Sequence, residues 1–486
     1  MALSLRIKAI LRVFGAVTAL ASLIIMPSLL LAMLWNESTV TPFLEAMAVP
    51  LLLGSALWFI FRESRYELRL RDGFLVTGGI WIIAGLVTAI PFYMALPSLS
   101  FTNAVFESVS GLTTTGSTML VGLDALPKSL LFFRASLNFF GGMGIVILAV
   151  AVLPMLKIGG MQLFKAESTG PVKDNKLTPR IAETARTLWM VYLGLNVLCA
   201  LAYWFGGMSF FDAVTHSLST IATGGFSTHD SGFGYWNNGM INTIAIVFML
   251  LGGMSFSMHW YAWRAATLSH YQASSELRTY IGITAVLCVV VSIYLWATNT
   301  FSGFGEALHH GVFQVVSNIT TTGFVTTGFV QWPGMLPMLL IMISFIGGCS
   351  GSTAGGMKVA RVQLVVQQGL RELRQLVHPK AQFLVTLGGK RVSESVVISV
   401  GGFCALYVTV YLILLLLLVA DGVDTDTAFS AVAACLNNLG PGMGKVASDF
   451  LILSDFSTWL LSFAMLVGRL EIFTLLVLFT PAFWQE

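Results

Sequence analysis

The sequence carries little charge: 10% of its 486 residues are Asp, Glu, Lys or Arg, and 56% are hydrophobic. Soluble domains carry about 25% charged residues, so this composition excludes an ordinary soluble protein and indicates a membrane protein. The few cysteines lie far apart with no CxxC pair, which favours buried thiols over disulfides or a metal site. They are Cys199, Cys288, Cys349, Cys404 and Cys435.

Motifs for catalysis are also missing. The seven histidines show no metal-ligand spacing. We find no HExxH, no phosphate-binding glycine loop between a strand and a helix, and no nucleophile constellation. We therefore expect no enzyme and no organic cofactor.

Apolar runs of roughly 20 residues, long enough to cross a bilayer, recur along the chain. We expect spans near residues 11–35, 43–61, 74–96, 130–156, 187–205, 240–262, 280–298, 335–360, 396–420 and 457–480. With both termini in the cytoplasm, 21 of the 26 Lys and Arg residues fall on the inner side, in keeping with the positive-inside rule. Only Lys128, Arg134 and Lys445 are left outside. The outer segments are acidic. Ordinary topology bias is sufficient to explain the basic inner side, and an acidic outer face would also concentrate cations at an external mouth.

One thirteen-residue pattern occurs four times. It reads AVFESVSGLTTTG at 104–116, AVTHSLSTIATGG at 213–225, GVFQVVSNITTTG at 311–323 and AFSAVAACLNNLG at 428–440. Each window predicts an apolar helix of about two turns that ends in small polar residues and a glycine. About 12 helical residues rise only about 18 Å, so such a segment cannot span the membrane. Its non-helical end must be buried in protein or line water.

A single TTTG in a membrane protein is more often a helix-ending turn than a filter, but four in register between pairs of spans favour a filter. Four such ends meeting at one axis would surround a dehydrated K+ with backbone carbonyls. Glycine allows the unusual backbone that this requires, and the partly negative helix ends would face the cation. The predicted filter residues are Thr113, Thr114, Thr115, Gly116, Ala222, Thr223, Gly224, Gly225, Thr320, Thr321, Thr322, Gly323, Asn437, Asn438, Leu439 and Gly440.

The expected span near residues 335–360 is interrupted by GGCSGSTAGG, in which five of ten residues are glycine. Glycine costs about 1 kcal/mol per residue in a helix, so we expect a loop beneath the filter rather than a glycine-rich packing helix. The predicted loop residues are Gly347, Gly348, Cys349, Ser350, Gly351, Ser352, Thr353, Ala354, Gly355 and Gly356.

Two basic residues accompany this loop. Arg469 lies in an otherwise apolar last span and should face the interior, either paired with another helix or projecting into the pore below the filter. Glu471 is two positions away, which on one helix is a different face, so we do not expect it to pair with Arg469. Lys358 either extends to the inner surface or helps to hold the loop.

Several strings carry a family resemblance. They are SGLTTTGST (110–118), STIATGGFSTHD (219–230), TTTGFVTTGF (320–329), LNNLGPG (436–442), GPVKDNKLTPRIAETA (170–185), IGGCSGSTAGGMK (346–358) and GRLEIFTLL (468–476). In these strings, and over nearly its whole length, the chain resembles the TrkH branch of the Trk/Ktr/HKT superfamily of K+ transporters. In that superfamily a glycine in each loop goes with K+ selectivity, and all four are present here. The fourth loop departs from the pattern, because Asn437, Asn438 and Leu439 replace the threonines.

The resemblance implies an all-α polytopic membrane protein with four helix–pore-loop–helix repeats in pseudo-fourfold arrangement around one pore. Two additional N-terminal transmembrane helices would precede them. The expected units are an N-terminal helix pair (1–70) and four pore repeats (71–165, 166–270, 271–375 with the loop at 347–356, and 376–486).

The resemblance also implies K+ uptake across the inner membrane by channel-like conduction, gated by the intramembrane loop and Arg469. A cytoplasmic TrkA-type ring that binds nucleotides (ATP/ADP or NAD(H)) would control it, and the protein would form a homodimer. The basic segments Lys157–Arg186 and Arg361–Arg391 are the expected docking surface, although contact with lipid headgroups explains them equally well. No nucleic-acid partner is expected.

The alternative is a K+ secondary transporter coupled to H+ or Na+. Such coupling usually places ionisable groups near the middle of the membrane. Arg469 and Glu471 are almost the only candidates in the expected spans.

Overall fold

The computed structural model describes residues 2–63, 69–147 and 181–485. These ranges are mostly helical. The only strands in them are β1 (Thr386–Leu387) and β2 (Lys390–Arg391), a short antiparallel pair. The predicted all-α class is confirmed.

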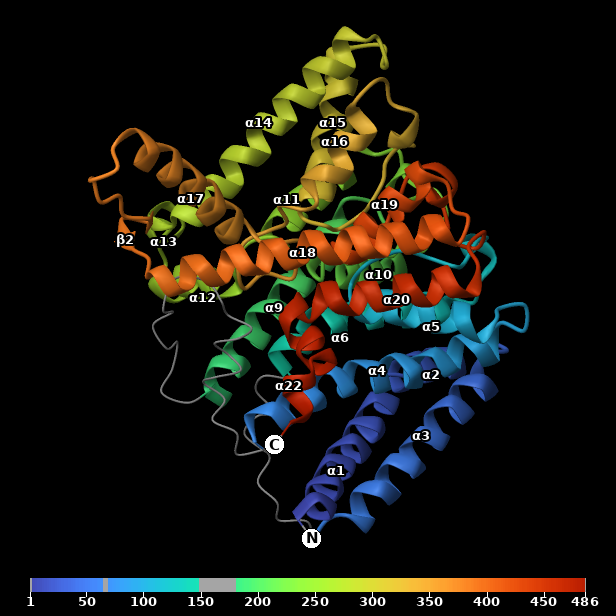
Figure 1. The fold of residues 1–486 in the computed structure, drawn as a ribbon. Helices are drawn as coiled ribbons and strands as arrows, with labels where there is room; N and C mark the ends of the chain where they lie inside the picture. The colour runs from blue at the N-terminus through green and yellow to red at the C-terminus, as the bar shows by residue number, and fades with distance from the viewer. Residues whose placement is uncertain (1, 64–68, 148–180, 486) are drawn as a thin grey trace.

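The N-terminal helices form a hairpin that lies against the first repeat. They are α1 (Ala2–Leu23), α2 (Met26–Trp35) and α3 (Val40–Ile60). Gly15 and Gly54 allow α1 and α3 to approach closely, since a Cβ atom on Gly54 would lie 2.6 Å from the Gly15 carbonyl oxygen. Figure 1 shows this hairpin at the lower edge of the molecule, with both chain termini on the same side.

Four repeats follow, each made of a long helix, a short pore helix, a loop and a second helix. The first contains α4 (Leu70–Ala95), α5 (Phe101–Leu112) and α6 (Lys128–Ile147). The second contains α9 (Ile181–Phe205), α10 (Phe210–Ile221), α11 (Gly239–Gly252) and α12 (Phe256–Ala265). The third contains α14 (Ser275–Ala297), α15 (Phe304–Ile319) and α16 (Leu336–Ile343). The fourth contains α18 (Glu394–Ala420), α19 (Thr425–Leu436), α20 (Asp455–Arg469) and α21 (Glu471–Leu476).

Shorter elements connect these helices. A single 3-10 turn follows each pore loop, in the order η1 (Leu123–Ala125), η3 (Gly232–Tyr235), η4 (Phe329–Gln331) and η5 (Gly444–Val446). The linking helices are α13 (Ser269–Ala273) and α17 (Val359–Val377), and the chain ends with η6 (Val477–Phe479) and α22 (Pro481–Trp484).

The repeats close into a ring. The second helix of each repeat packs against the pore helix of the next, in the pairs α6–α10, α11–α15 and α16–α19. The last pair, α20–α5, returns to the first repeat. The predicted four-repeat fold around one axis is confirmed.

The second helices are broken where the sequence predicts continuous spans. Helices α11 and α12 meet at 97°, and α20 and α21 meet at 113°. Among the described residues, six helical segments are long and apolar enough to cross a membrane, and the bent pairs raise this number to up to eight. The expected span at 335–360 ends with α16 and continues as an irregular segment, as its glycine content predicts. The pore helices have 12 to 16 residues, which is longer than the two turns predicted.

Some predictions fall outside the described residues. These are the end of the expected span at 130–156, the basic residues of 157–180, the greater part of the 170–185 string and the proposed boundary at residue 165.

Candidate ion filter and gate

All four pore helices end in the same backbone turn. In each, the residue two positions before the loop glycine is left-handed: Thr114, Thr223, Thr321 and Asn438 have φ of 54°, 52°, 54° and 54°. In the first repeat, the amide of Thr115 donates to the Ser110 carbonyl (2.9 Å) and that of Thr114 to the Gly111 carbonyl (3.1 Å). The same two bonds recur in the other three repeats. This is the Schellman helix ending, with Thr or Asn where glycine is usual. The fourth loop therefore departs in side chains but not in backbone path.

The glycine that ends each turn lies against the next repeat. Each has positive φ, and a Cβ atom on it would collide with the carbonyl oxygen of the residue before the next glycine. The added Cβ atom would lie 2.5 Å from the Gly224 oxygen at Gly116, 2.1 Å from the Thr322 oxygen at Gly225, 2.0 Å from the Leu439 oxygen at Gly323 and 2.7 Å from the Thr115 oxygen at Gly440. The contacts run in order through all four repeats and return to the first. The four turns that contain the predicted filter residues therefore meet in one closed ring through these glycines and the residue before each.

The exposure of the ring differs among the repeats. Gly116, Gly225 and Gly323 are partly exposed, although the residues just before them are buried. Gly440 is buried. Solvent therefore reaches the backbone at three of the four glycines, and the ring is only approximately fourfold.

Polar side chains hold the turns from behind, differently in each repeat. Hydroxyl pairs join Thr113 to Thr115 (2.7 Å) and Thr320 to Thr322 (2.8 Å). In the second repeat, the Thr223 hydroxyl donates to its neighbour's carbonyl at 2.7 Å.

The asparagines of the fourth repeat replace these hydroxyl pairs with bonds to other segments. Asn437 accepts from the Tyr407 hydroxyl and donates to the Ser344 hydroxyl at 2.8 Å. Asn438 donates to the Thr115 hydroxyl at 2.9 Å, which ties the fourth turn to the first.

The glycine-rich segment lies directly against three of these turns. The Thr353 hydroxyl donates to the Ile221 carbonyl (2.8 Å), at the end of α10. The Gly355 amide donates to the Thr321 hydroxyl (2.6 Å), and the Gly356 amide to the Asn437 carbonyl (3.1 Å). These contacts are at the end of the turns where the pore helices stop. The predicted loop therefore lies beside the ring, next to the helix ends.

Other predicted loop residues anchor the segment to its surroundings. The Cys349 amide donates to the Gly253 carbonyl (2.8 Å), and the Gly351 carbonyl accepts from Phe256 (3.1 Å). Within the loop, Ser352 donates to the Cys349 carbonyl (2.6 Å), and a Cβ atom on Gly347 would lie 2.2 Å from the Gly355 oxygen. Beyond the loop, the Val359 amide donates to the Gly348 carbonyl (3.0 Å).

Both basic residues named from the sequence contact this loop. Arg469 is 5% exposed and donates to the carbonyl oxygens of Thr353 (2.9 Å) and Gly141 (2.8 Å). Arg469, in the fourth repeat, thus joins the loop that follows the third repeat to α6 of the first repeat. The ammonium of Lys358 donates to the Ala354 carbonyl, and this contact corresponds to holding the loop rather than extending to the surface.

A further charged residue, Glu276, holds the loop, and an ion pair lies beside the loop's C-terminal end; the sequence analysis identified neither. Glu276, in the first turn of α14, accepts from the amides of Ser350 (2.7 Å) and Ala360 (3.2 Å). Arg361 pairs with Glu471 at 2.6 Å and is buried, so it is removed from the expected docking surface. Glu276 looks like an ordinary charge at the start of a span, so only its contacts reveal its role.

The argument that Arg469 and Glu471 occupy different faces of one helix rested on a wrong assumption. Helix α20 ends at Arg469 and α21 begins at Glu471, whose φ is 53°. The two residues therefore flank a break, and rules for spacing on a helix do not apply between them.

Arg134 is a second correction. The charge distribution placed it in an outer segment, but it is buried within α6 and pairs with Glu107 of α5 at 2.8 Å. A glutamate inside a window expected to be buried was the available signal for such a pair.

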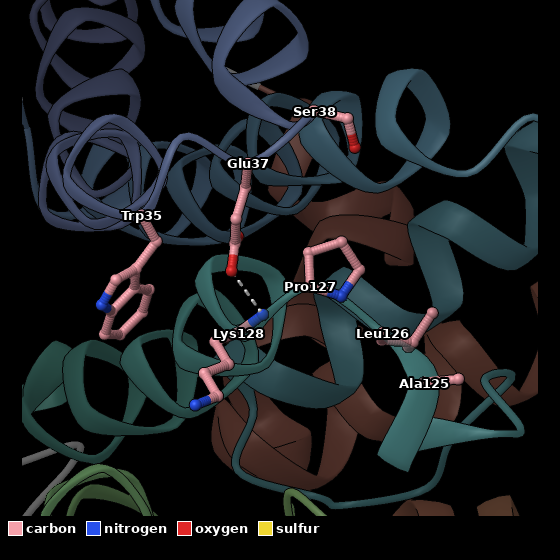
Figure 2. Close-up of a pocket in the computed structure, with 7 residues that line it drawn as sticks. All are labelled: Trp35, Glu37, Ser38, Ala125, Leu126, Pro127 and Lys128. Atoms are coloured by element: carbon pink, nitrogen blue, oxygen red, sulfur yellow. Dashed lines mark hydrogen bonds between the residues drawn. The ribbon is translucent and has the colours of Figure 1, made fainter.

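A separate pocket lies near the start of α6 and does not take part in the ring. It is lined by Trp35, Glu37, Ser38, Ala125, Leu126, Pro127 and Lys128 (Figure 2). Its carboxylate, Glu37, accepts from the backbone amides of Lys128 and Ser129, both at 3.0 Å, and so caps α6. In the described ranges, no group of three or more His, Cys, Asp or Glu residues could hold a metal ion.

Comparison with known proteins agrees with this geometry. The sequence model of the TrkH family, described as cation transport protein, matches residues 40–486. The chain is 48% identical over 485 residues to the Trk system potassium uptake protein TrkH of Vibrio parahaemolyticus, covering 99% of this chain and 100% of that protein. It is 47% identical over 481 residues to the Trk system potassium uptake protein TrkH of Escherichia coli K12, covering 99% of each. The crystal structure of the potassium transporter TrkH from Vibrio parahaemolyticus matches with a TM-score of 0.90 and 45% identity, over 99% of this chain and 100% of that chain. The chain therefore belongs to the TrkH family of cation transport proteins.

Proposed function

We propose that this protein takes up K+ by conduction through the closed ring of four turns. The observation that carries the proposal is the cyclic contact between each loop glycine and the carbonyl of the next repeat. Backbone carbonyls gathered around one axis can replace the water shell of K+. The relatives named as potassium uptake proteins support K+ as the transported ion.

Two features of the ring favour a cation. Each pore helix ends immediately before its turn, so four partly negative helix ends face the same place. The Schellman bonds run from amides of the turns to carbonyls inside the pore helices. They do not use the carbonyls of Thr115, Gly224, Thr322 and Leu439, which lie against the neighbouring glycines. The hydroxyl pairs of the first and third turns and the amides of Asn437 and Asn438 bond to neighbouring protein groups, which favours coordination by the backbone.

The loop and Arg469 act as the gate in this proposal. The loop bonds to turns of three repeats, so it obstructs the path at the helix-end side of the ring. Arg469 adds a positive charge beside that path. Opening requires these hydrogen bonds to break or exchange.

A cytoplasmic partner would supply the signal for opening. We place the protein in the cell inner membrane with both termini in the cytoplasm, where a TrkA-type ring binding ATP/ADP or NAD(H) docks. With Arg361 buried, the exposed part of the basic surface on and after α17 includes Arg374 and Lys380. A homodimer in contact with membrane lipids completes the proposed assembly.

Ion flux from the purified full-length chain in liposomes tests the proposal. We expect a reversal potential that follows the K+ gradient alone, and a loss of K+ preference when Gly116, Gly225, Gly323 or Gly440 is changed to Ser. A reversal potential that also moves with the H+ or Na+ gradient would instead establish the coupled transporter.

A further inference from the structure

A buried ion pair lies behind the first turn. Glu107 of α5 and Arg134 of α6 have side chains 0% and 2% exposed, with 2.8 Å between Glu107 Oε1 and Arg134 Nε. Glu107 also accepts from the Met119 amide (2.7 Å) and from the Thr118 hydroxyl (3.0 Å). Thr118 and Met119 are the second and third residues after Gly116. The glutamate therefore holds the chain where it leaves the first turn.

Arg134 extends this network to the second repeat. It donates to the Ser227 carbonyl (3.0 Å) and to the Thr118 hydroxyl (3.1 Å), and its guanidinium lies 4.1 Å from the centroid of the Phe226 ring. Phe226 and Ser227 immediately follow Gly225. One side chain thus contacts the chain leaving two neighbouring turns at once.

The network ends on the second pore helix. His216 occupies the same place in its thirteen-residue window as Glu107, and its Nε2 lies 3.0 Å from the Ser227 hydroxyl. Glu107, Arg134, Thr118, Ser227 and His216 form a continuous chain of polar contacts between α5 and α10, in which Glu107, Arg134 and His216 are buried and the two hydroxyl residues are partly exposed. We name this set the inter-repeat brace.

The other two repeats have no charged counterpart to the brace. The matching window positions hold Gln314 and Ala431, and the positions that match Thr118 hold Val325 and Gly442. A buried ion pair gives little net stability, because desolvation offsets the attraction between the charges. A fully bonded polar network does, however, restrict the structure to one arrangement.

We propose that Glu107 and Arg134 are positioning residues for ion selectivity. They fix the outgoing ends of the first two turns and thereby the separation of the carbonyls around Gly116 and Gly225. This inference rests on the proposed filter function. The brace does not touch the ion, so it acts on discrimination between K+ and Na+ through the backbone.

The test compares Glu107→Gln and Arg134→Met with Asp72→Asn in the full-length protein. Asp72→Asn breaks another ion pair, at 2.6 Å from Arg6, in which the carboxylate is buried and which joins α4 to α1 rather than to a pore helix or its turn. Ion selectivity would be read from uptake of K+ under Na+ competition in cells without other K+ uptake. A second readout is the extent to which K+ and Na+ each raise the Tm of the purified protein, which reports ion binding whether the gate is open or closed.

We expect both brace variants to lower the preference for K+ over Na+ by about tenfold, equivalent to about 1.4 kcal/mol in the free energy that separates the two ions. Asp72→Asn should lower Tm equally in both salts and leave the preference unchanged. If the brace variants behave like Asp72→Asn, the pair is only structural and the inference is wrong.

Two additions keep the outcome clear. Gly225→Ser tests the filter itself. If this variant also leaves the preference for K+ over Na+ unchanged, the proposed function fails. If Gly225→Ser changes the preference and the brace variants do not, only the brace is rejected. Thr118→Val removes the hydroxyl between the two charged groups and retains both charges. If Glu107→Gln and Arg134→Met do not fold, Thr118→Val decides: a reduced preference for K+ over Na+ supports the brace, and an unchanged preference rejects it.

Discussion

The guanidinium of Arg469 is hydrogen-bonded to the carbonyl oxygen of Thr353, with 2.9 Å between Nη1 and O. This bond joins the end of α20 to the loop beside the ring. A second bond to Gly141, at 2.8 Å, joins the same side chain to α6. In the proposed gate, Arg469 would therefore supply both a hydrogen-bonded link between the loop and α6 and a positive charge near the ion path.

Arg469→Ala should raise K+ flux in the absence of a partner. It removes the link to the loop and the repulsion between like charges, and electrostatic focusing in clefts changes local ion concentration by about 10–10³-fold. We expect an increase at the lower end of that range, measured as K+ efflux from liposomes. Arg469→Lys keeps the charge without the paired bonds and should give a smaller increase. Unchanged flux in Arg469→Ala would rule out its gating role.

Gly323→Ala should impair K+ uptake. The added methyl group would lie 2.0 Å from the Leu439 carbonyl oxygen, and the residue has φ of 79°. A non-glycine residue in such a conformation costs about 1–3 kcal/mol before the collision is counted. Gly282→Ala is the matched control, because nothing lies within 4 Å of its added Cβ atom and alanine favours the helix α14. Equal uptake by the two variants would contradict the ring geometry.

Glu276→Ala should loosen the gate loop. The Ser350 and Ala360 amides lose a charged acceptor, a change worth about 1.5–3 kcal/mol for each strong bond. Cys349 is 0% exposed in this loop, so its reaction with a thiol reagent reports the change. We expect faster labelling in Glu276→Ala and little change in Glu276→Gln, which keeps an acceptor oxygen. Cys349→Ser in the same background identifies the labelled site.

The contact between His229 and Asp124 should weaken at high pH. Burial lowers the pKa of His229, but its bonds and charge interactions with Asp212 and Asp124 outweigh this and raise it above 6.5. The hydrogen bond from His229 lowers the pKa of Asp124 below 3.8. The stabilisation by His229 is therefore complete below pH 6.5 and is lost as pH rises through its folded-state pKa, while the Asp124 contribution is lost only below pH 3.8.

This loss is measured as Tm against pH. For a partly exposed pair we expect a change of about 0.2–1 kcal/mol. His229→Gln should remove the decline above pH 6.5 that the unchanged protein shows, while leaving the rest of the profile in place. A decline of the same size in His229→Gln would assign it to other groups.

The site could be predicted from the sequence as far as its local patterns extend. The four windows, the glycine of each and the broken segment at 347–356 depend on composition and spacing within a few residues. The divergent fourth window was recognisable because its small first residue and last glycine remain. Its backbone has the same left-handed turn as the others, with Asn438 in place of threonine.

The charged contacts could not be predicted in this way. The charge distribution placed Arg134 in an outer segment, and Glu276 looks like an ordinary charge before a span. Neither contact could be inferred from neighbouring residues, because each partner is distant in the sequence. The bend at Arg469 was also missed, since no glycine or proline lies between Arg469 and Glu471 to mark the end of the helix.

The sequence by itself determined the membrane class, the repeat and the four turns, because hydrophobicity and helix termination are properties of neighbouring residues. Only the tertiary structure decided which carbonyl each glycine faces, which charges hold the loop and how the first two turns are joined. Those contacts connect segments that are distant in the sequence, many of them in different repeats, so they form only when the chain has folded.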